Sequence, residues 1–200
     1  KINKIERCIL LSIKKDRLEC QHNICKENLT TGNCYHVEGD LIVSITTYGR
    51  RVHQVYLTLE SIANQTCKPN KVILWLDENE FSKDSLPLSL KKLCKRGLIV
   101  RFCPNYKSYK KLVPSIMSFP HDTIVTIDDD ILYPQDFLEN LIGFSEKNKG
   151  EIVGYRAHEV TFNGNLLNSY KNWRFEQDII KDVKNPFLTT GAGPLFPPRV

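Results

Sequence analysis

The chain has 200 residues, of which 41% are hydrophobic and 26% are charged, as expected for one ordinary globular domain with at most a small appendage. It contains no apolar run long enough to span a bilayer and no recognisable signal peptide. The net charge of +5 is mild and scattered in short clusters without interleaved aromatic residues, which argues against nucleic-acid binding. The same charge suits a polyanionic small molecule or contact with an anionic membrane surface.

Cysteine usage indicates the compartment. Seven cysteines, an odd number, favour reduced thiols in a cytosolic setting over a disulfide scaffold. We therefore expect a cytoplasmic protein, and its basic charge would also suit the inner face of the membrane. Residues of metal-ligating type gather near the N-terminus, where they predict either a metal knuckle or, since the spacing fits no common zinc finger, reduced cysteines in an irregular cap. They are Cys20, His22, Cys25, Cys34 and His36.

Two parts of the chain differ in pattern. Residues 1–38 form a cysteine-containing N-terminal extension, and residues 39–200 form the main domain. The extension begins with apolar residues at helical spacing, which predict an amphipathic helix with a basic polar face: Ile2, Ile5, Ile9, Leu10 and Ile13. Because the sequence starts without Met and stops at Val200 in mid-pattern, we interpret it as a segment of a longer protein.

The main domain alternates strand and helix four times. Strands are predicted at 41–47, 71–77, 98–103 and 123–127, and helices at 52–65, 86–96, 108–119 and 134–149. Alternation at such short intervals predicts an α/β fold with a doubly wound, mostly parallel sheet and helices on both faces. Residues 151–162 alternate more loosely before a turn at 163–165, which predicts a small antiparallel hairpin at a sheet edge.

The strand at 123–127 is the most informative stretch. All five of its residues are β-branched, and it leads directly into Asp128, Asp129 and Asp130. Open α/β sheets bind ligands at the carboxyl ends of their strands. Three adjacent carboxylates repel one another unless a cation, a proton or a buried base compensates them. Hard oxygen ligands suit Mg²⁺ or Mn²⁺ bridging a phosphate, whereas a merely solvated acidic turn seldom follows such a strand directly.

Three motifs make residues 41–198 resemble the GT-A glycosyltransferases, in particular bacterial family 2 and exostosin-type domains. They are Ser-Ile-Thr-Thr-Tyr-Gly-Arg at 44–50, Ser-Tyr-Lys-Lys-Leu-Val-Pro at 108–114 and Thr-Ile-Asp-Asp-Asp-Ile-Leu-Tyr-Pro at 126–134. The resemblance implies a Rossmann-like GT-A fold and a metal-dependent enzyme with Mn²⁺ or Mg²⁺ as cofactor. It also implies transfer of a hexosyl or N-acetylhexosaminyl group from a UDP-sugar to a glycan or lipid-linked acceptor, in surface polysaccharide synthesis.

The resemblance further implies a role for individual residues. The implied donor-binding residues are Thr47, Tyr48, Arg50 (or its neighbour Arg51), Asp77 at the uracil ring, Lys111 (or its neighbour Lys110), Asp128 and Asp129. The implied metal ligands are Asp128 and Asp130. An acceptor-side wall of small residues, which lets a sugar approach closely, would consist of Thr190, Gly191, Ala192 and Gly193.

One departure from the family pattern concerns the catalytic base. Relatives carry a further acidic pair downstream of the Gly-rich segment, so we expect the base to lie beyond Val200. Within these residues the candidates are Glu159, Glu176, Asp178 and Asp182. Two other functions remain open. A nucleotidyltransferase would have a Gly-rich loop directly after the first strand, and a non-catalytic nucleotide- or carbohydrate-binding module would need no base.

Overall fold

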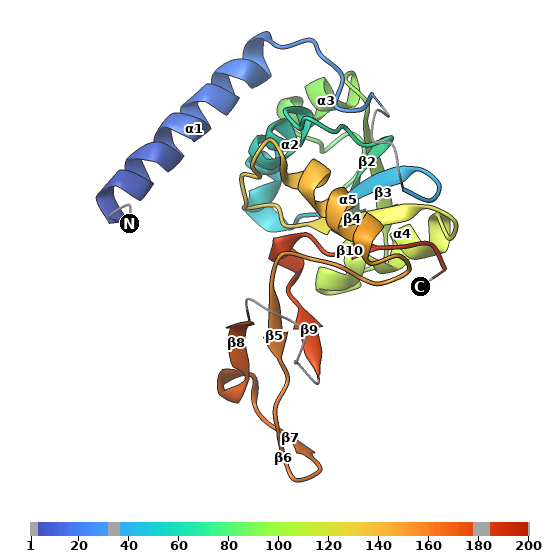
Figure 1. The fold of residues 1–200 in the computed structure, drawn as a ribbon. Coiled ribbons are helices and arrows are strands. Elements are labelled where there is room, and N and C mark those ends of the chain that lie inside the picture. Colours follow the sequence, from blue (N-terminus) through green and yellow to red (C-terminus); the bar gives the residue numbers. More distant parts are fainter. Residues whose placement is uncertain (1–3, 32–36, 178–184, 200) are drawn as a thin grey trace.

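A five-stranded sheet forms the centre of the computed structural model, which describes residues 4–31, 37–177 and 185–199 (Figure 1). Its strand order is β10-β4-β1-β2-β3. Four strands are parallel, and the last pairs antiparallel to β4 at the edge. The strands are β1 (Leu41–Thr46), β2 (Lys71–Asp77), β3 (Leu98–Cys103), β4 (Thr123–Ile127) and β10 (Leu195–Phe196). The predicted mostly parallel α/β sheet is confirmed.

Helices cover both faces of this sheet, which explains why its central strands are continuous apolar runs. On one face lie α2 (Val55–Ala63), α3 (Leu88–Cys94) and α5 (Phe137–Lys147), which bury Leu59, Leu90 and Leu141 in the larger core. On the other face α4 (Val113–Ser118) packs Ile116 against a smaller cluster that includes Trp75. Helices packed on both faces therefore hold the strands of the sheet rigidly in place.

Two predicted helices begin later than expected, because each is preceded by a 3₁₀ helix. The element η1 (Gly49–His53) precedes α2, and η2 (Lys107–Lys111) precedes α4. Pro114 lies in the first turn of α4, where its missing N–H costs no hydrogen bond, and this favours a helix start at that point. Both 3₁₀ helices carry basic residues, and each lies between the end of a sheet strand and the following helix.

The helix predicted in the N-terminal extension is present as α1 (Lys4–Ile24), which runs along the outside of the body (Figure 1). It is fixed by the buried side chain of Leu18 and by Lys14, whose Nζ donates to the carbonyl oxygen of Tyr133 at 3.1 Å. Ile9 and Ile13, on the expected apolar face, are 53% and 58% exposed. The helix therefore packs on the body through the face that carries Lys14 and Leu18.

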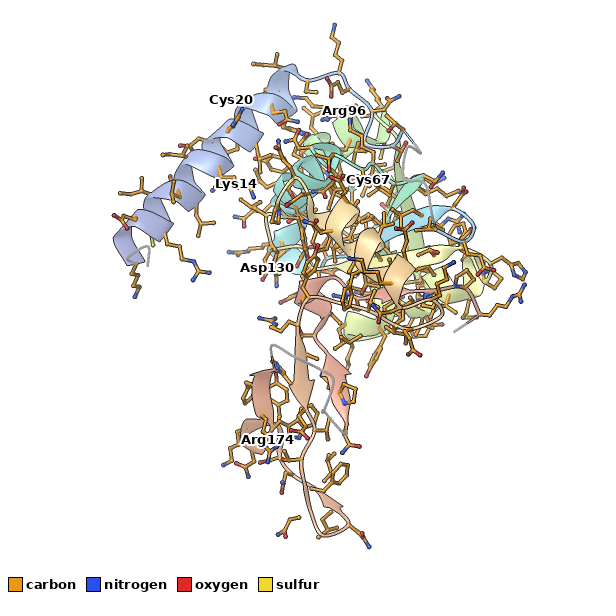
Figure 2. The ribbon with its side chains drawn as sticks, in the orientation of Figure 1. Lys14, Cys20, Cys67, Arg96, Asp130 and Arg174 are labelled. Atoms are coloured by element: carbon orange, nitrogen blue, oxygen red, sulfur yellow. The ribbon has the colours of Figure 1, made fainter. Side chains whose placement is uncertain are left out.

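The cysteines differ from expectation in one respect. Cys67 is disulfide-bonded, so the expectation of fully reduced thiols is wrong. Cys20, which Figure 2 labels, and Cys25 are free, whereas Cys34 and His36 lie outside the described residues. Within the described ranges no three His, Cys, Asp or Glu side chains are grouped to hold a metal ion, and no helix is long and apolar enough to cross a membrane.

A small antiparallel subdomain projects from the body (Figure 1). Its three-stranded sheet has the order β8-β5-β9, and a separate hairpin pairs β6 with β7 around Gly164. The strands are β5 (Ala157–Glu159), β6 (Phe162–Asn163), β7 (Leu166–Leu167), β8 (Arg174–Gln177) and β9 (Pro186–Leu188), with 3₁₀ helices η3 (Tyr170–Asn172) and η5 (Thr190–Ala192). The expected antiparallel hairpin forms, and the segment that leads to it reaches the edge of the main sheet, where Val153 forms an isolated antiparallel bridge with Leu195 of β10.

Gly193 offers a test of how closely this subdomain joins the body. Its φ is +65°, and a Cβ built on it would lie 2.2 Å from Cζ of Phe137. Gly193→Ala combines left-handed strain with overlap against a buried ring, so we expect the free energy of unfolding to fall by about 3 kcal/mol. Gly150 is the control, because its φ of +78° is also positive but nothing lies within 4 Å of its Cβ position. Gly150→Ala should cost about 1–2 kcal/mol in urea denaturation, and equal losses would contradict the packing argument.

Candidate active site

A cavity of about 570 Å³ lies at the carboxyl ends of the parallel strands. The register pairs Ile45 of β1 with Ile127 of β4, so the residues that follow these two strands meet at one edge of the sheet. The cavity is lined by residues at or after the ends of β1, β2, β3 and β4 and by one residue of η5: Thr46, Thr47, Tyr48, Arg51, Glu80, Asn105, Lys107, Ser108, Lys110, Lys111, Asp128, Asp129, Asp130 and Thr190.

The three aspartates after β4 are paired with two basic side chains. Lys111 forms an ion pair with Asp128. Nη2 of Arg51 lies 2.8 Å from Oδ1 of Asp129 and 2.6 Å from Oδ2 of Asp130. Figure 2 labels Asp130, whose side chain is the most exposed of the three at 62%. Basic groups from η1 and η2 thus compensate the carboxylates that the sheet brings together.

Asp129 is turned inward, unlike its neighbours. Its side chain is only 8% exposed, and Oγ1 of the fully buried Thr47 donates a hydrogen bond to its Oδ2 at 2.6 Å. Oγ1 of Thr58 in α2 donates to the backbone oxygen of Asp129 at 3.0 Å. Burial raises the pKa of the Asp129 carboxyl group, and the hydrogen bond from Thr47 and the charge of Arg51 oppose this shift. Asp129 therefore fixes the turn, and it lines the cavity together with the more exposed Asp128 and Asp130.

Tyr133 connects residues 128–130, called the acid turn below, to the Gly-rich segment at residues 190–193. Its Oη accepts a hydrogen bond from the backbone N–H of Asp128 at 3.0 Å and donates one to the carbonyl oxygen of Gly191 at 3.3 Å. Burial raises the pKa of Tyr133, so the hydroxyl keeps the proton that it donates. A Cβ on Gly191 would lie 2.8 Å from Oδ2 of Asp128, which explains why glycine stands there. The sequence singled out the Tyr-Pro turn but gave this hydroxyl no role.

The comparisons with known proteins identify the family. The model for glycosyl transferase family 2 matches residues 42–196, which is most of the chain. The chain belongs to this family. The predicted resemblance to GT-A glycosyltransferases of the family 2 type is thereby confirmed, and the mostly parallel sheet agrees with it.

One solved structure with a similar fold is the mannosyltransferase PcManGT from Pyrobaculum calidifontis in complex with GDP-Man and Mn²⁺. The sequence identity is 16%, the TM-score is 0.46, and the match covers 76% of this chain and 48% of the other. The chain thus spans about half the length of that mannosyltransferase. A search of curated protein sequences found no match.

In this family 2 chain the structure distinguishes the neighbouring arginines. Arg51 lines the cavity, whereas Arg50 is exposed and does not line it. Tyr48 lines it with 58% of its surface exposed, and its ring centroid lies 5.4 Å from the Arg51 guanidinium carbon. The pKa of Arg51 is raised, first by the hydrogen bond to Tyr48 and then by the charges of Asp129 and Asp130.

The two neighbouring lysines have different partners. Lys111 reaches Asp128, and its carbonyl oxygen accepts a hydrogen bond from Oγ of Ser44 at 2.5 Å, which fixes η2 against β1. Nζ of Lys110 lies 4.0 Å from Oδ2 of Asp77. Asp77 ends β2 as predicted, but it is 3% exposed, its Oδ1 accepts the N–H of Asn79 at 2.9 Å, and it does not line the cavity. The expected contact of Asp77 with the uracil ring stays a prediction.

Several cavity residues escaped the sequence reasoning. Glu80 lies three residues beyond β2, and its Oε1 accepts the N–H of Gly49 at 2.6 Å, which holds the loop after β1. Asn105, Lys107 and Ser108 follow β3. The available signal was their position just after strands of a parallel sheet, but side chains in loops lack the periodicity that marks helices and strands.

Only some of the candidates for the acceptor-side wall and the catalytic base lie at the cavity. Thr190 lines the cavity, Gly191 packs against Asp128, and Ala192 and Gly193 do not line the cavity. Glu159 lies in the projecting sheet, where its carboxylate is 2.9 Å from Nη1 of Arg174. Glu176 lies in β8 of the same sheet, and Asp178 and Asp182 are outside the described residues. Glu159 does not line the cavity.

The donor set fits a divalent cation of the kind that this family fold implies. Asp128 and Asp130 present hard carboxylate oxygens to the cavity, with 30% and 62% of their side chains exposed. Mg²⁺ and similar cations are usually held by one or two carboxylates together with substrate phosphates, not by a cage made of protein alone. The two outer aspartates therefore suit a cation that a bound diphosphate helps to hold.

Proposed function

We propose that this chain is a metal-dependent glycosyltransferase that moves a hexosyl or N-acetylhexosaminyl group from a UDP-sugar to a glycan or lipid-linked acceptor in surface polysaccharide synthesis. One observation carries the proposal. Two basic side chains, Lys111 and Arg51, meet the carboxylates of residues 128–130 in one cavity at the carboxyl edge of the sheet. Cations and carboxylates in this arrangement suit a diphosphate and the Mn²⁺ or Mg²⁺ ion that binds it.

The proposed division of work follows from these contacts. When bound, the divalent cation supplies Lewis-acid stabilisation to the departing diphosphate. Lys111 and Arg51 add positive charge beside the same oxygens, where developing negative charge is costly in a partly dry cavity. Tyr133 and Thr47 hold the acid turn in place through their hydrogen bonds. These residues bind and orient the donor, and the base that activates the acceptor is a separate element.

The nucleoside is expected to stack on Tyr48. Its ring is more than half exposed on the cavity wall, close to the arginine that the diphosphate would meet. Stacking of a base on an aromatic side chain contributes about 1–3 kcal/mol and is tolerant of base identity. Asp77, the residue expected to contact the uracil ring, is buried. The preference among uracil, guanine and thymine is therefore to be measured.

Calorimetric titration of UDP in the presence of Mn²⁺, repeated with EDTA, tests the donor site. We expect binding that EDTA abolishes and that Asp130→Asn weakens at least about tenfold, because this change removes a charged ligand from the cation. Asp84→Asn is the control, since Asp84 is an exposed carboxylate away from the cavity. GDP and dTDP titrated in the same way identify the preferred base.

Two outcomes count against the proposal. If UDP, GDP and dTDP all fail to bind with Mn²⁺ present, the cavity is not a donor site. If a diphosphate binds but the whole protein turns over no UDP-sugar, the chain is a nucleotide-binding module and not a transferase. Turnover is best followed as release of UDP from UDP-glucose and UDP-N-acetylglucosamine, because these two donors separate hexosyl from N-acetylhexosaminyl specificity.

A further inference from the structure

Arg51 holds the open end of the acid turn. Its Nη2 contacts carboxylate oxygens of both Asp129 and Asp130, at 2.8 Å and 2.6 Å. Of the three aspartates at 128–130, Asp130 has the most exposed side chain. The positive charge of the guanidinium group on Oδ2 of Asp130 repels a divalent cation and so weakens its binding to the same carboxylate. Arg51 and the cation therefore compete for Asp130.

Arg51 gains a second anionic partner when a nucleotide occupies the cavity. Its side chain is 35% exposed, lines the cavity and starts from the short element η1. A guanidinium group binds a diphosphate through paired charged hydrogen bonds, much as it binds a carboxylate. Arg51 can thus exchange one anion for the other while it remains in the cavity.

The protein's own ligands are too few to outcompete Arg51. In the part of the chain that the structure describes, no group of three His, Cys, Asp or Glu side chains is placed to hold an ion. The carboxylate of Asp128 is already paired with Lys111. A cation in this cavity consequently needs oxygens from the diphosphate, and it also needs Arg51 to leave Asp130.

We propose that Arg51 is a placeholder on Asp130, which a nucleoside diphosphate draws away so that the divalent cation binds together with the nucleotide and only weakly before it. This inference rests on the proposed function, since it requires a donor diphosphate in the cavity. By linkage, the nucleotide raises the affinity for the cation by the same factor as the cation raises the affinity for the nucleotide. Such couplings are typically about 5–150-fold, and we expect about tenfold or more here.

The experiment measures Mn²⁺ binding directly, by electron paramagnetic resonance of the free ion, with and without UDP (or GDP or dTDP if one of these binds better). Three proteins are compared: wild type, Arg51→Gln and Arg174→Gln. Arg174 is the matched control, an arginine paired with the carboxylate of Glu159 on the projecting subdomain, away from the cavity (Figure 2). Wild type and Arg174→Gln should bind Mn²⁺ weakly alone and about tenfold more tightly with the nucleotide.

Arg51→Gln should bind Mn²⁺ without nucleotide about tenfold more tightly than wild type, so the nucleotide should strengthen Mn²⁺ binding by a smaller factor than in wild type, the part that the diphosphate oxygens contribute as ligands. If Arg51→Gln binds Mn²⁺ alone no better than wild type, or keeps the full coupling, the placeholder role is overturned while the donor site stands. If wild type binds no Mn²⁺ even with all three nucleotides, the donor site itself is refuted and the inference with it.

Discussion

Replacing Glu60 by alanine is expected to lower the free energy of unfolding by about 3–5 kcal/mol, because a buried ion pair then loses only one of its partners. The carboxylate of Glu60 is fully buried, and its Oε1 lies 2.7 Å from Nδ1 of His22 and 2.5 Å from Nη1 of Arg96. Without it, the guanidinium group of Arg96 loses its carboxylate partner on a side chain that is only 8% exposed. Urea denaturation followed by tryptophan fluorescence measures the loss.

The control for this change is Glu19→Ala on the outer helix. Glu19 pairs with Lys15 at 3.7 Å, and both side chains are largely exposed, so its removal should cost less than about 0.5 kcal/mol. The double variant Glu60→Leu/Arg96→Met removes both buried charges and should be more stable than Glu60→Ala alone. A loss in Glu60→Ala no greater than that in Glu19→Ala would show that the buried carboxylate contributes little.

The same helix also supports the candidate site, which explains why α2 carries so many buried polar residues. Thr58 donates to the backbone of Asp129, and Oγ of Ser61 accepts the N–H of Tyr133 at 3.1 Å. Glu60 lies between these two residues and links α2 to α1 through His22. The helix therefore links the N-terminal extension to the acid turn through these polar contacts. Apolar spacing in the sequence indicated this helix but could not reveal those partners.

Sequence patterns predicted the sheet well because its strands are buried on both faces. The strands at 71–77, 98–103 and 123–127 have the predicted bounds, since continuous apolar and β-branched runs mark them clearly. Helix starts were less predictable. Gly49 and Lys107 have φ values of +51° and +53°, and each is the first residue of a 3₁₀ helix. These 3₁₀ helices occupy the first residues of the α-helices that were predicted to begin at 52 and 108. The two-residue strand β10 is too short to leave a pattern.

The candidate site was predictable in its elements but not in its pairings. The acid triplet and the basic residues near 50 follow predicted strands, whereas the resemblance to GT-A glycosyltransferases singled out the lysines near 110 and the Gly-rich segment. Which member of Arg50 and Arg51 faces the cavity depends on the turn of η1, which no spacing rule determines. Likewise, the approach of Gly191 to Asp128 joins residues far apart in the sequence, and only the folded chain reveals it.

Replacing Lys111 by methionine is expected to weaken Mn²⁺-dependent UDP binding by about 10–150-fold. The side chain of Lys111 is 5% exposed, and its ammonium group pairs with Asp128 while facing the cavity. A hydrogen bond to a charged group contributes about 1.5–3 kcal/mol, which corresponds to this range in dissociation constant. Methionine keeps most of the buried aliphatic volume, so the change removes the charge with little loss of packing.

The control is Lys91→Met, because Lys91 is an exposed lysine of α3 whose Nζ donates to the backbone oxygen of Asp84 at 3.2 Å. Calorimetry on both variants, with thermal unfolding to show that each is folded, separates charge loss at the cavity from general loss of charge. If folded Lys111→Met binds UDP as tightly as Lys91→Met, Lys111 serves only to hold Asp128. The diphosphate would then depend on Arg51 and the cation, which makes the exchange at Asp130 the decisive electrostatic step in donor binding.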